Sequence, residues 1–189
     1  FNFILNSKVP DLNVELTDLS TCFNLNALVK PFRNIYVKND LIGELFKNLL
    51  RLSDIDRNKY NELLDLLYDS LDTDRLPEAF GAEDLFYIAS DDLSLSPDQL
   101  YVHKSQIKNL SFLSDSELQQ IYPSICALPV NDLTFNINGL NEENYITFLS
   151  ILPDLSLNDV EKLIINRPLE GYLNFQSVID LSGVNADRI

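Results

Sequence analysis

The sequence predicts an α+β protein that is mostly α-helical. Glycine is rare, with 5 residues in 189, and leucine is abundant, which favours helices over a β-sandwich or barrel. Extended patterns are concentrated in residues 1–29, where short apolar–polar alternations are separated by turn-rich stretches, whereas a helical period follows Pro31. With 46% hydrophobic and 23% charged residues, the chain is expected to bury a proper core.

The most distinctive extended segment is Cys-Phe-Asn-Leu-Asn-Ala-Leu, residues 22–28. Its apolar side chains alternate with Asn24 and Asn26. This alternation predicts a strand that buries its apolar face and carries both asparagines on its second face.

Helical periodicity dominates residues 30–189 and predicts two lobes. The first lobe spans about 30–126, a strand-like crossing covers 126–139, and the second lobe spans about 140–189. The expected helices cover residues 39–52, 56–71, 142–152 and 157–166, with others from about 100, after a capping box at 114–117, and from 175.

Part of the helical region is repeated. Residues 107–118 align without a gap with residues 178–189, and both read as a short helix, a tight turn and a capped helix. This predicts two helix–hairpin–helix-like units. Such hairpins can bind nucleic-acid phosphates, but the formal net charge of −15 repels phosphate, so a structural use is favoured.

The composition argues against an enzyme and against several partners. The sequence has a single histidine, His103, and no glycine-framed serine that it could activate as a nucleophile. It also has no glycine-rich loop of the kind that binds phosphate. The acidic charge disfavours nucleic acid and anionic lipid surfaces as partners. No run approaches the roughly 20 apolar residues that span a bilayer, so any membrane anchor is expected upstream of Phe1.

Two cysteines, Cys22 and Cys126, lie far apart in the sequence. Two buried thiols and a disulfide both fit, and the strand-like flanks, which could pair side by side, favour the disulfide. A bridge that closes a loop of roughly 100 residues would stabilise the fold by about 4–5 kcal/mol in the chain-entropy model. It would also indicate an oxidising compartment.

Acidic residues gather around a long loop, about 72–96, which is rich in aspartate and proline. A cation would hold such a loop, and calcium prefers carboxylate oxygens on adaptable loops, although the EF-hand spacing is not met. A solvated acidic loop is the alternative. The acidic residues of interest are Asp69, Asp72, Asp74, Glu83 and Asp84.

An ordered set of motifs identifies a resemblance. The strings Cys-Phe-Asn-Leu-Asn-Ala-Leu (22–28), Asp-x-x-Asp-x-Asp (69–74), Gly-Ala-Glu-Asp (81–84), Ile-Cys-Ala-Leu-Pro (125–129) and Phe-Asn-Ile-Asn (135–138) occur in this order. The chain resembles the K-type minor pseudopilin of the bacterial type II secretion system from about residue 14 to 184. It departs from the family pattern at Ser70, where tryptophan is common, and at 139–140, where Gly-Leu replaces Thr-Ala.

The resemblance implies a pilin-like β part with a large inserted helical domain. It implies a non-enzymatic protein, at the periplasmic face of the bacterial inner membrane, that initiates or caps the pseudopilus with the I- and J-type minor pseudopilins. The family's N-terminal transmembrane helix and final strands are missing from this sequence. Bound Ca²⁺ is implied at Asp72, Asp74, Glu83 and Asp84, with Asp69 beside them. The alternative is a secreted calcium-binding adaptor that uses tandem helix–hairpin–helix modules for protein contacts.

Overall fold

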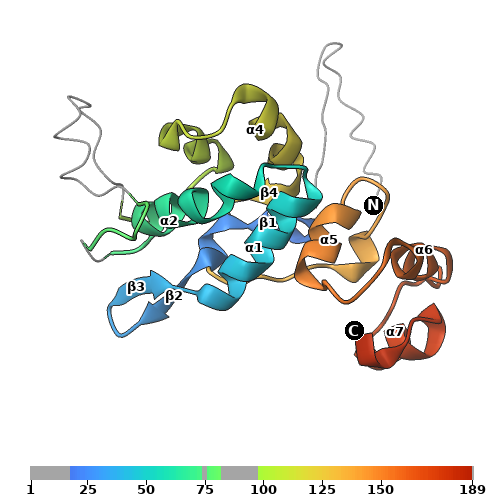
Figure 1. Cartoon of the computed structure of the whole chain (residues 1–189). Coiled ribbons are helices and arrows are strands. Elements are labelled where there is room, and N and C mark those ends of the chain that lie inside the picture. The colour runs from blue at the N-terminus through green and yellow to red at the C-terminus, as the bar shows by residue number, and fades with distance from the viewer. Residues whose placement is uncertain (1–17, 74–75, 82–97, 189) are drawn as a thin grey trace, which may run out of the picture.

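A computed structural model of the chain describes residues 18–73, 76–81 and 98–188. They are mostly helical with two small two-stranded sheets, which confirms the α+β prediction (Figure 1). The α-helices are α1 (Asp40–Leu52), α2 (Tyr60–Leu71), α4 (Asp115–Ile121), α5 (Tyr145–Ile151), α6 (Leu157–Ile165) and α7 (Phe175–Ser182). The strands are β1 (Phe23–Asn24), β2 (Val29–Phe32), β3 (Ile35–Lys38) and β4 (Ile125–Cys126). None of the helices in these ranges is long and apolar enough to cross a membrane.

Short 3-10 helices connect many of these elements. They are Leu19–Thr21, Leu25–Leu28, Arg57–Lys59, Lys104–Leu110, Tyr122–Ser124, Ile137–Gly139 and Ala186–Arg188. Several begin where an Asn or Asp side chain accepts a hydrogen bond from the backbone two residues later. Local capping chemistry therefore sets many of the chain reversals in this molecule.

The predicted strand at 22–28 forms only at its beginning. β1 pairs in parallel with β4, so that Phe23 lies opposite Ile125 and Asn24 opposite Cys126. The chain then turns into the buried 3-10 helix Leu25–Leu28, because the Asn24 side chain accepts a hydrogen bond from the Asn26 N–H at 3.3 Å. The prediction of a continuous strand was wrong, since the cap competes with strand pairing.

Asn26 is fully buried, and its side chain forms hydrogen bonds with backbone groups of distant residues. Its amide nitrogen donates to the Tyr101 carbonyl at 2.8 Å and to the Leu128 carbonyl at 2.7 Å. Its amide oxygen accepts from the Tyr101 N–H at 2.7 Å. A buried amide with three short hydrogen bonds fixes its partners in one geometry, because any displacement leaves polar groups desolvated and unpaired.

Asn24 acts on the segment that follows β4. Its amide nitrogen donates to the carbonyls of Val130 at 2.7 Å and Asp132 at 3.1 Å, and its oxygen accepts from the Leu128 N–H at 3.0 Å. These bonds replace strand pairing after Cys126. Of the strand-like crossing predicted at 126–139, only Cys126 lies in a strand, β4, and Ile137–Gly139 form a 3-10 helix. The residues between them are not assigned to a strand.

The same arrangement recurs in the second half of the chain. In Phe-Asn-Ile-Asn, Asn136 caps the 3-10 helix Ile137–Gly139 as Asn24 caps its own. Asn138 then donates to the Tyr172 carbonyl at 3.0 Å and accepts from the Tyr172 N–H at 2.8 Å. In both places one asparagine side chain bonds the N–H and the carbonyl of a single tyrosine residue, an arrangement that we call a clasp. Asn138 and Tyr172 thus repeat the clasp that Asn26 forms with Tyr101.

The helices after each clasp also correspond. The pair α1–α2 aligns with the pair α5–α6 at positions 100 residues apart. Buried residues coincide in this alignment: Leu49 with Leu149, Ile55 with Leu155, and Leu63 with Leu163. The described chain therefore contains two similar helical halves, whereas the exact lobe boundaries remain a prediction.

The predicted helix–hairpin–helix-like units are not established by this structure. In each, the first helix ends at a left-handed residue, Ser111 at φ 50° or Gly183 at φ 73°. However, the helix before Ser111 is a 3-10 helix, and the helix after Gly183 is a single 3-10 turn. The left-handed turn residue is thus what the two repeats share within the described residues.

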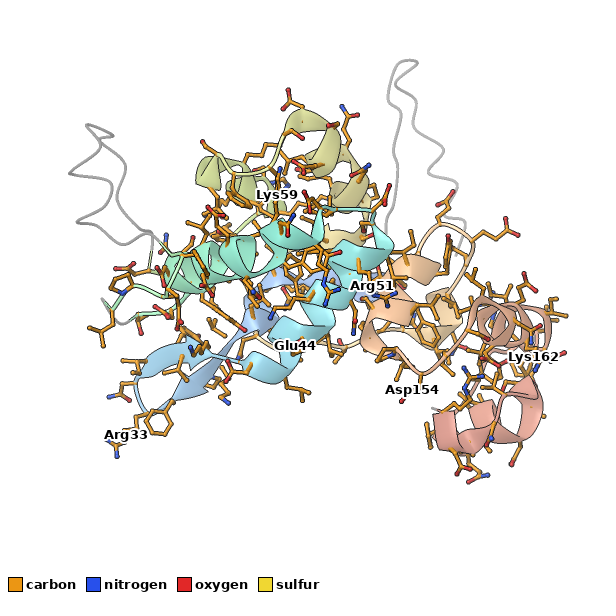
Figure 2. All side chains as sticks on the ribbon, in the orientation of Figure 1. Arg33, Glu44, Arg51, Lys59, Asp154 and Lys162 are labelled. Carbon is orange, nitrogen blue, oxygen red and sulfur yellow. A yellow bond between two sulfur atoms is a disulfide. The ribbon has the colours of Figure 1, made fainter. Side chains whose placement is uncertain are left out.

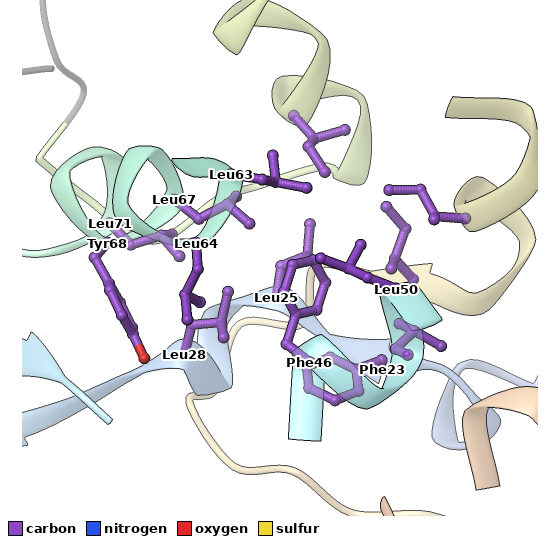
Figure 3. Packing of buried hydrophobic residues seen from close by; sticks show 14 of the residues in the cluster. Phe23, Leu25, Leu28, Phe46, Leu50, Leu63, Leu64, Leu67, Tyr68 and Leu71 are labelled. Atoms are coloured by element: carbon purple, nitrogen blue, oxygen red, sulfur yellow. The ribbon is translucent and has the colours of Figure 1, made fainter. Parts of the chain in front are cut away.

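The main core lies between α1, α2 and the segment that carries β1 (Figure 3). Phe23 and Phe46 meet with ring centroids 5.5 Å apart. α1 and α2 approach closely at Gly43, where an added Cβ would lie 2.1 Å from the Tyr68 hydroxyl oxygen. Each fully buried side chain of this size contributes about 1.5–3 kcal/mol. The other fully buried members in both helices and this segment are Leu25, Leu28, Leu49, Leu50, Leu63, Leu67 and Leu71.

Residues 29–38 form a hairpin, not the beginning of the predicted helical lobe. β2 and β3 pair antiparallel, with Val29 opposite Lys38 and Phe32 opposite Ile35. Arg33 adopts a left-handed conformation at the turn, φ 56°. The hairpin extends away from the helices, at the lower left of Figure 1.

A second core joins α5, α6 and α7. Its buried members are Leu140, Phe148, Leu149, Leu155, Val160, Leu163, Tyr172, Val178 and Val184. α5 also packs against α1, so it belongs to both cores. The two helical halves are therefore joined by direct packing as well as by the chain.

The predicted disulfide between Cys22 and Cys126 is confirmed. The bridge spans 104 residues and lies at the β1–β4 pair, where both cysteines are buried. It therefore joins the same two segments that Asn24 holds through hydrogen bonds.

An ion pair joins the start of α2 to α4. The Lys59 ammonium, at the end of the 3-10 helix just before α2, lies 2.7 Å from a Glu117 carboxylate oxygen, on the side of α4 (Figure 2). Glu117 also accepts from the Ser114 N–H in the capping box predicted from the sequence. The Lys59 hydrogen bond, followed by those of Ser114, lowers the pKa of Glu117 to about 2.

We expect Asn26→Asp to lower the free energy of unfolding by about 3 kcal/mol or more. The substitution keeps the shape but sets a carboxylate oxygen against the Tyr101 and Leu128 carbonyls. Urea unfolding followed by circular dichroism measures the loss. Asn109→Asp, at an exposed position, is the matched control. Equal midpoints for the two variants would contradict the role given to Asn26.

We expect Glu117→Gln to cost about 1 kcal/mol of stability at neutral pH. Because the folded pKa is depressed, this contribution is present above the unfolded value of about 4.5 and is lost as pH falls through about 2. The difference in urea midpoint between wild type and variant should shrink across that window. A difference that is independent of pH would show that the carboxylate charge is not the cause.

Candidate functional site

The candidate site lies at the C-terminal end of α2, where two of the predicted acidic residues are buried. Asp69 is fully buried, and Asp72, which follows the last helical residue, is 4% exposed. Leu63 and Leu67 lie on one face of α2, whereas Asp69 follows Asp65 by one turn on a different face. Asp69 is buried there because residues 76–81 pack against its carboxylate. Buried carboxylates at the negative end of a helix dipole favour a nearby positive charge or donor.

The Asp69 carboxylate holds the segment 76–81 against α2. Both of its oxygens accept from the Glu78 N–H, at 3.0 and 3.3 Å. Gly81 approaches so closely that an added Cβ would lie 1.9 Å from an Asp69 oxygen. The Gly-Ala-Glu-Asp motif therefore begins with glycine because no side chain fits beside Asp69.

Further contacts attach this segment to α2 and to the hairpin. The Asp65 carboxylate accepts from the Phe80 N–H at 3.1 Å. Lys38 lies 2.7 Å from Glu78 in an ion pair, and the Glu78 hydrogen bond raises the pKa of Lys38. The sequence analysis missed Asp65 and Glu78, although Asp65 precedes Asp69 by one helical turn.

Thr73 joins the end of α2 to β3. The Tyr36 N–H donates to the Thr73 hydroxyl at 2.9 Å, and the Thr73 N–H donates to the Tyr36 carbonyl at 3.4 Å. Residues 76–81, which together with the end of α2 we call the acidic segment, thus contact α2 on one side and the hairpin on the other.

Negative charge concentrates around this end of α2. Burial is the main cause that raises the pKa of the Tyr68 phenol, and nearby carboxylates raise it further. These carboxylates are Asp40, Glu44, Asp65 and Glu78. A divalent cation would be electrostatically favoured here.

The five predicted metal ligands are placed unequally. Asp69 and Asp72 lie three residues apart at the end of α2, while Asp74, Glu83 and Asp84 fall outside the described residues. Within the described ranges, no three His, Cys, Asp or Glu side chains gather as a metal site. The predicted ligands are all carboxylates, a donor type that would suit calcium better than softer metals.

Ser70 connects this site to the Asn26 clasp. It stands where the resemblance leads us to expect tryptophan, and it is buried. Its hydroxyl lies 2.8 Å from the Tyr101 hydroxyl, and the Tyr101 backbone is held by Asn26. A polar contact therefore replaces the expected aromatic one at this position.

Comparison with known proteins supports the family resemblance. The family model for type II secretion system (T2SS) protein K matches residues 21–130, which include the Asn24–Asn26 pair, the acidic segment and both cysteines. A putative type II secretion system protein K of Escherichia coli K12 is 30% identical over 176 residues, covering 90% of this chain and 54% of the relative. The type II secretion system protein K of Aeromonas hydrophila is 26% identical over 176 residues, covering 89% and 53%.

A solved structure shares the fold. It is the crystal structure of the GspK-GspI-GspJ complex from the enterotoxigenic Escherichia coli type 2 secretion system, matched with a TM-score of 0.72 and 22% identity over 90% of this chain and 59% of that one. The chain spans about half the length of the relatives it matches in sequence. Since the family model covers more than half of the residues, the chain belongs to the type II secretion system protein K family.

Proposed function

We propose that this protein is a minor pseudopilin that acts at the tip of the type II secretion pseudopilus and makes or breaks no covalent bond. It assembles there with the I- and J-type minor pseudopilins into a heterotrimer and initiates or caps the filament. The observation that carries this proposal is the family match across residues 21–130. It is supported by the fold shared with a protein solved as a GspK-GspI-GspJ complex.

The architecture suits a rigid element that works by shape. Two polar clasps, two joined cores and a buried disulfide hold segments that are distant in sequence. Such a body resists deformation, because each displacement would expose unpaired buried groups. In a filament tip, a rigid helical bulk would block the addition of another subunit above it.

The proposed location is the periplasmic face of the bacterial inner membrane. The disulfide supports an oxidising compartment, which the periplasm provides. The family resemblance adds a membrane-spanning helix as the anchor. The acidic surface suits protein partners better than anionic lipid.

Calcium is proposed as the ion that orders the acidic segment. Asp69 and Asp72 offer buried carboxylates at the negative end of α2, and the family resemblance adds Asp74, Glu83 and Asp84. A bound ion would supply charge compensation and pin the segment. Asp69 already holds residues 76–81 against α2 through the Glu78 N–H, so a bound ion would add a second attachment for the same loop.

We expect the purified chain to form a stable complex with the periplasmic parts of the I- and J-type minor pseudopilins. Size-exclusion chromatography with light scattering at micromolar concentration should give one species with the mass of a 1:1:1 heterotrimer. Asn26→Asp is the control. It leaves the partner proteins unchanged but disrupts the Asn26–Tyr101 clasp, so less complex should form. If no complex forms with the wild-type chain, the assembly proposal is wrong.

We expect removal of calcium to lower the melting temperature of the wild-type chain. A ligand at 100 times its dissociation constant stabilises by about 2.7 kcal/mol, so melts with calcium and after exhaustive EDTA dialysis should differ clearly. Asp72→Asn should lose this difference, whereas Asp154→Asn, at an exposed position in the other half, should keep it. An unchanged wild-type midpoint after dialysis would reject the calcium site without bearing on assembly.

A further inference from the structure

A cleft of about 470 Å³ opens between α1 and the start of α2. It is lined by three basic side chains, Lys47, Arg51 and Arg57, and by one acidic side chain, Glu44. Its uncharged lining residues are Asn48, Tyr60 and Asn61. This concentration of positive charge occurs in a chain with 14 basic and 29 acidic residues. The cleft is therefore electrostatically unlike the average surface of the molecule.

The helical period explains how the cleft is built. Glu44, Asn48 and Arg51 follow one another at spacings of four and three residues, so they share one face of α1. The chain then reverses through residues 53–56, which brings Arg57 and Tyr60 against the end of that face. Glu44 and Arg51 both project from α1 (Figure 2).

The two arginines have no carboxylate partner in the described part of the chain. Glu44 is engaged by Lys47 at 2.8 Å, and none of the salt bridges there includes Arg51 or Arg57. Burial raises the pKa of the Tyr60 phenol, the charges of Arg51 and Arg57 lower it, and those of Asp54 and Asp56 raise it. The cleft therefore has two carboxylates near its arginines, but neither forms an ion pair with them. Two exposed guanidinium groups thus flank the phenol at the wall of the cleft.

One of these basic side chains is not required by the fold. A cleft beside α5 and α6 in the second half corresponds to the first at three lining positions, 157, 160 and 161. It is mainly apolar, with Glu142 and Glu161 in its lining. At positions 100 residues apart, Leu157 replaces Arg57 and Glu161 replaces Asn61. The start of the second helix therefore forms without a basic residue at the position of Arg57, so this charge is not needed for the turn into the helix.

We propose that the α1–α2 cleft binds an acidic segment of a protein partner. Each arginine can hold a carboxylate through two parallel hydrogen bonds, a geometry that lysine does not offer. Asn48 and Asn61 supply neutral hydrogen-bonding groups for the segment's backbone, and the Tyr60 ring can pack against its methylene groups.

The acidity of the remaining surface gives this binding its selectivity. A net charge of −15 disfavours an acidic peptide over most of the surface and favours its association with basic places such as this cleft. The inference goes beyond the assembly proposed above and does not depend on calcium, because the cleft lies at the opposite end of α2 from Asp69.

The test is a nuclear magnetic resonance titration of the isotope-labelled chain with an end-blocked hexaglutamate peptide. Saturable shifts should be confined to residues 44–61, and they should weaken as salt is raised. The double variant Arg51→Ala/Arg57→Leu should weaken binding by about tenfold or more. Arg57→Leu introduces the residue found at the equivalent position of the second half, so the fold should be kept, and unchanged melting temperature checks this.

Two controls make the outcome decisive. Arg33→Ala removes an exposed arginine from the hairpin turn and should leave the affinity unchanged. Arg51→Lys keeps the charge and should lose part of the affinity, because the two-point contact is lost. The proposal is overturned by shifts that do not saturate, by equal affinity in the double variant, or by inorganic phosphate binding as tightly as the peptide, which would indicate a small-anion site.

Discussion

The fold depends on a buried amide. Asn26 satisfies both the N–H and the carbonyl of Tyr101 and one carbonyl after β4, in a place that water does not reach. Without it, the segments before α1, before the 104–110 helix and after β4 would have no common point of attachment. Apolar packing supplies most of the stability, but it is not directional, whereas the amide determines which backbone groups must meet.

The same amide positions the acidic site. Tyr101, held by Asn26, reaches Ser70 through its hydroxyl, and Ser70 is the residue next to Asp69 in α2. The Cys22–Cys126 bridge constrains the other side of the clasp. Buried polar contacts and one disulfide at the β1–β4 pair therefore join the site to segments that are far apart in the sequence.

The two helical halves of the chain share their buried polar contacts but differ in their surface charges. Both halves use an Asn-x-Asn pair, a tyrosine backbone and two helices in the same order. The polar groups that define the architecture are kept, while the surfaces between the paired helices differ in charge. Buried amides tolerate little change, because a wrong partner leaves a desolvated group unpaired. Exposed side chains in a cleft can change freely and are available for recognition.

The sequence by itself determined the helical class, most helix positions, the cysteine pairing as the favoured alternative and the acidic nature of the site. These follow from periodicity, capping residues and composition, which act over a few neighbours. Only the tertiary structure decided that Asn24 ends a strand, that Asn26 and Asn138 clasp tyrosine backbones, that residues 29–38 form a hairpin, and that Asp65 and Glu78 belong beside Asp69. The partners in these contacts are brought together by the packing of whole helices, and no local pattern records which distant backbone group a buried side chain will meet.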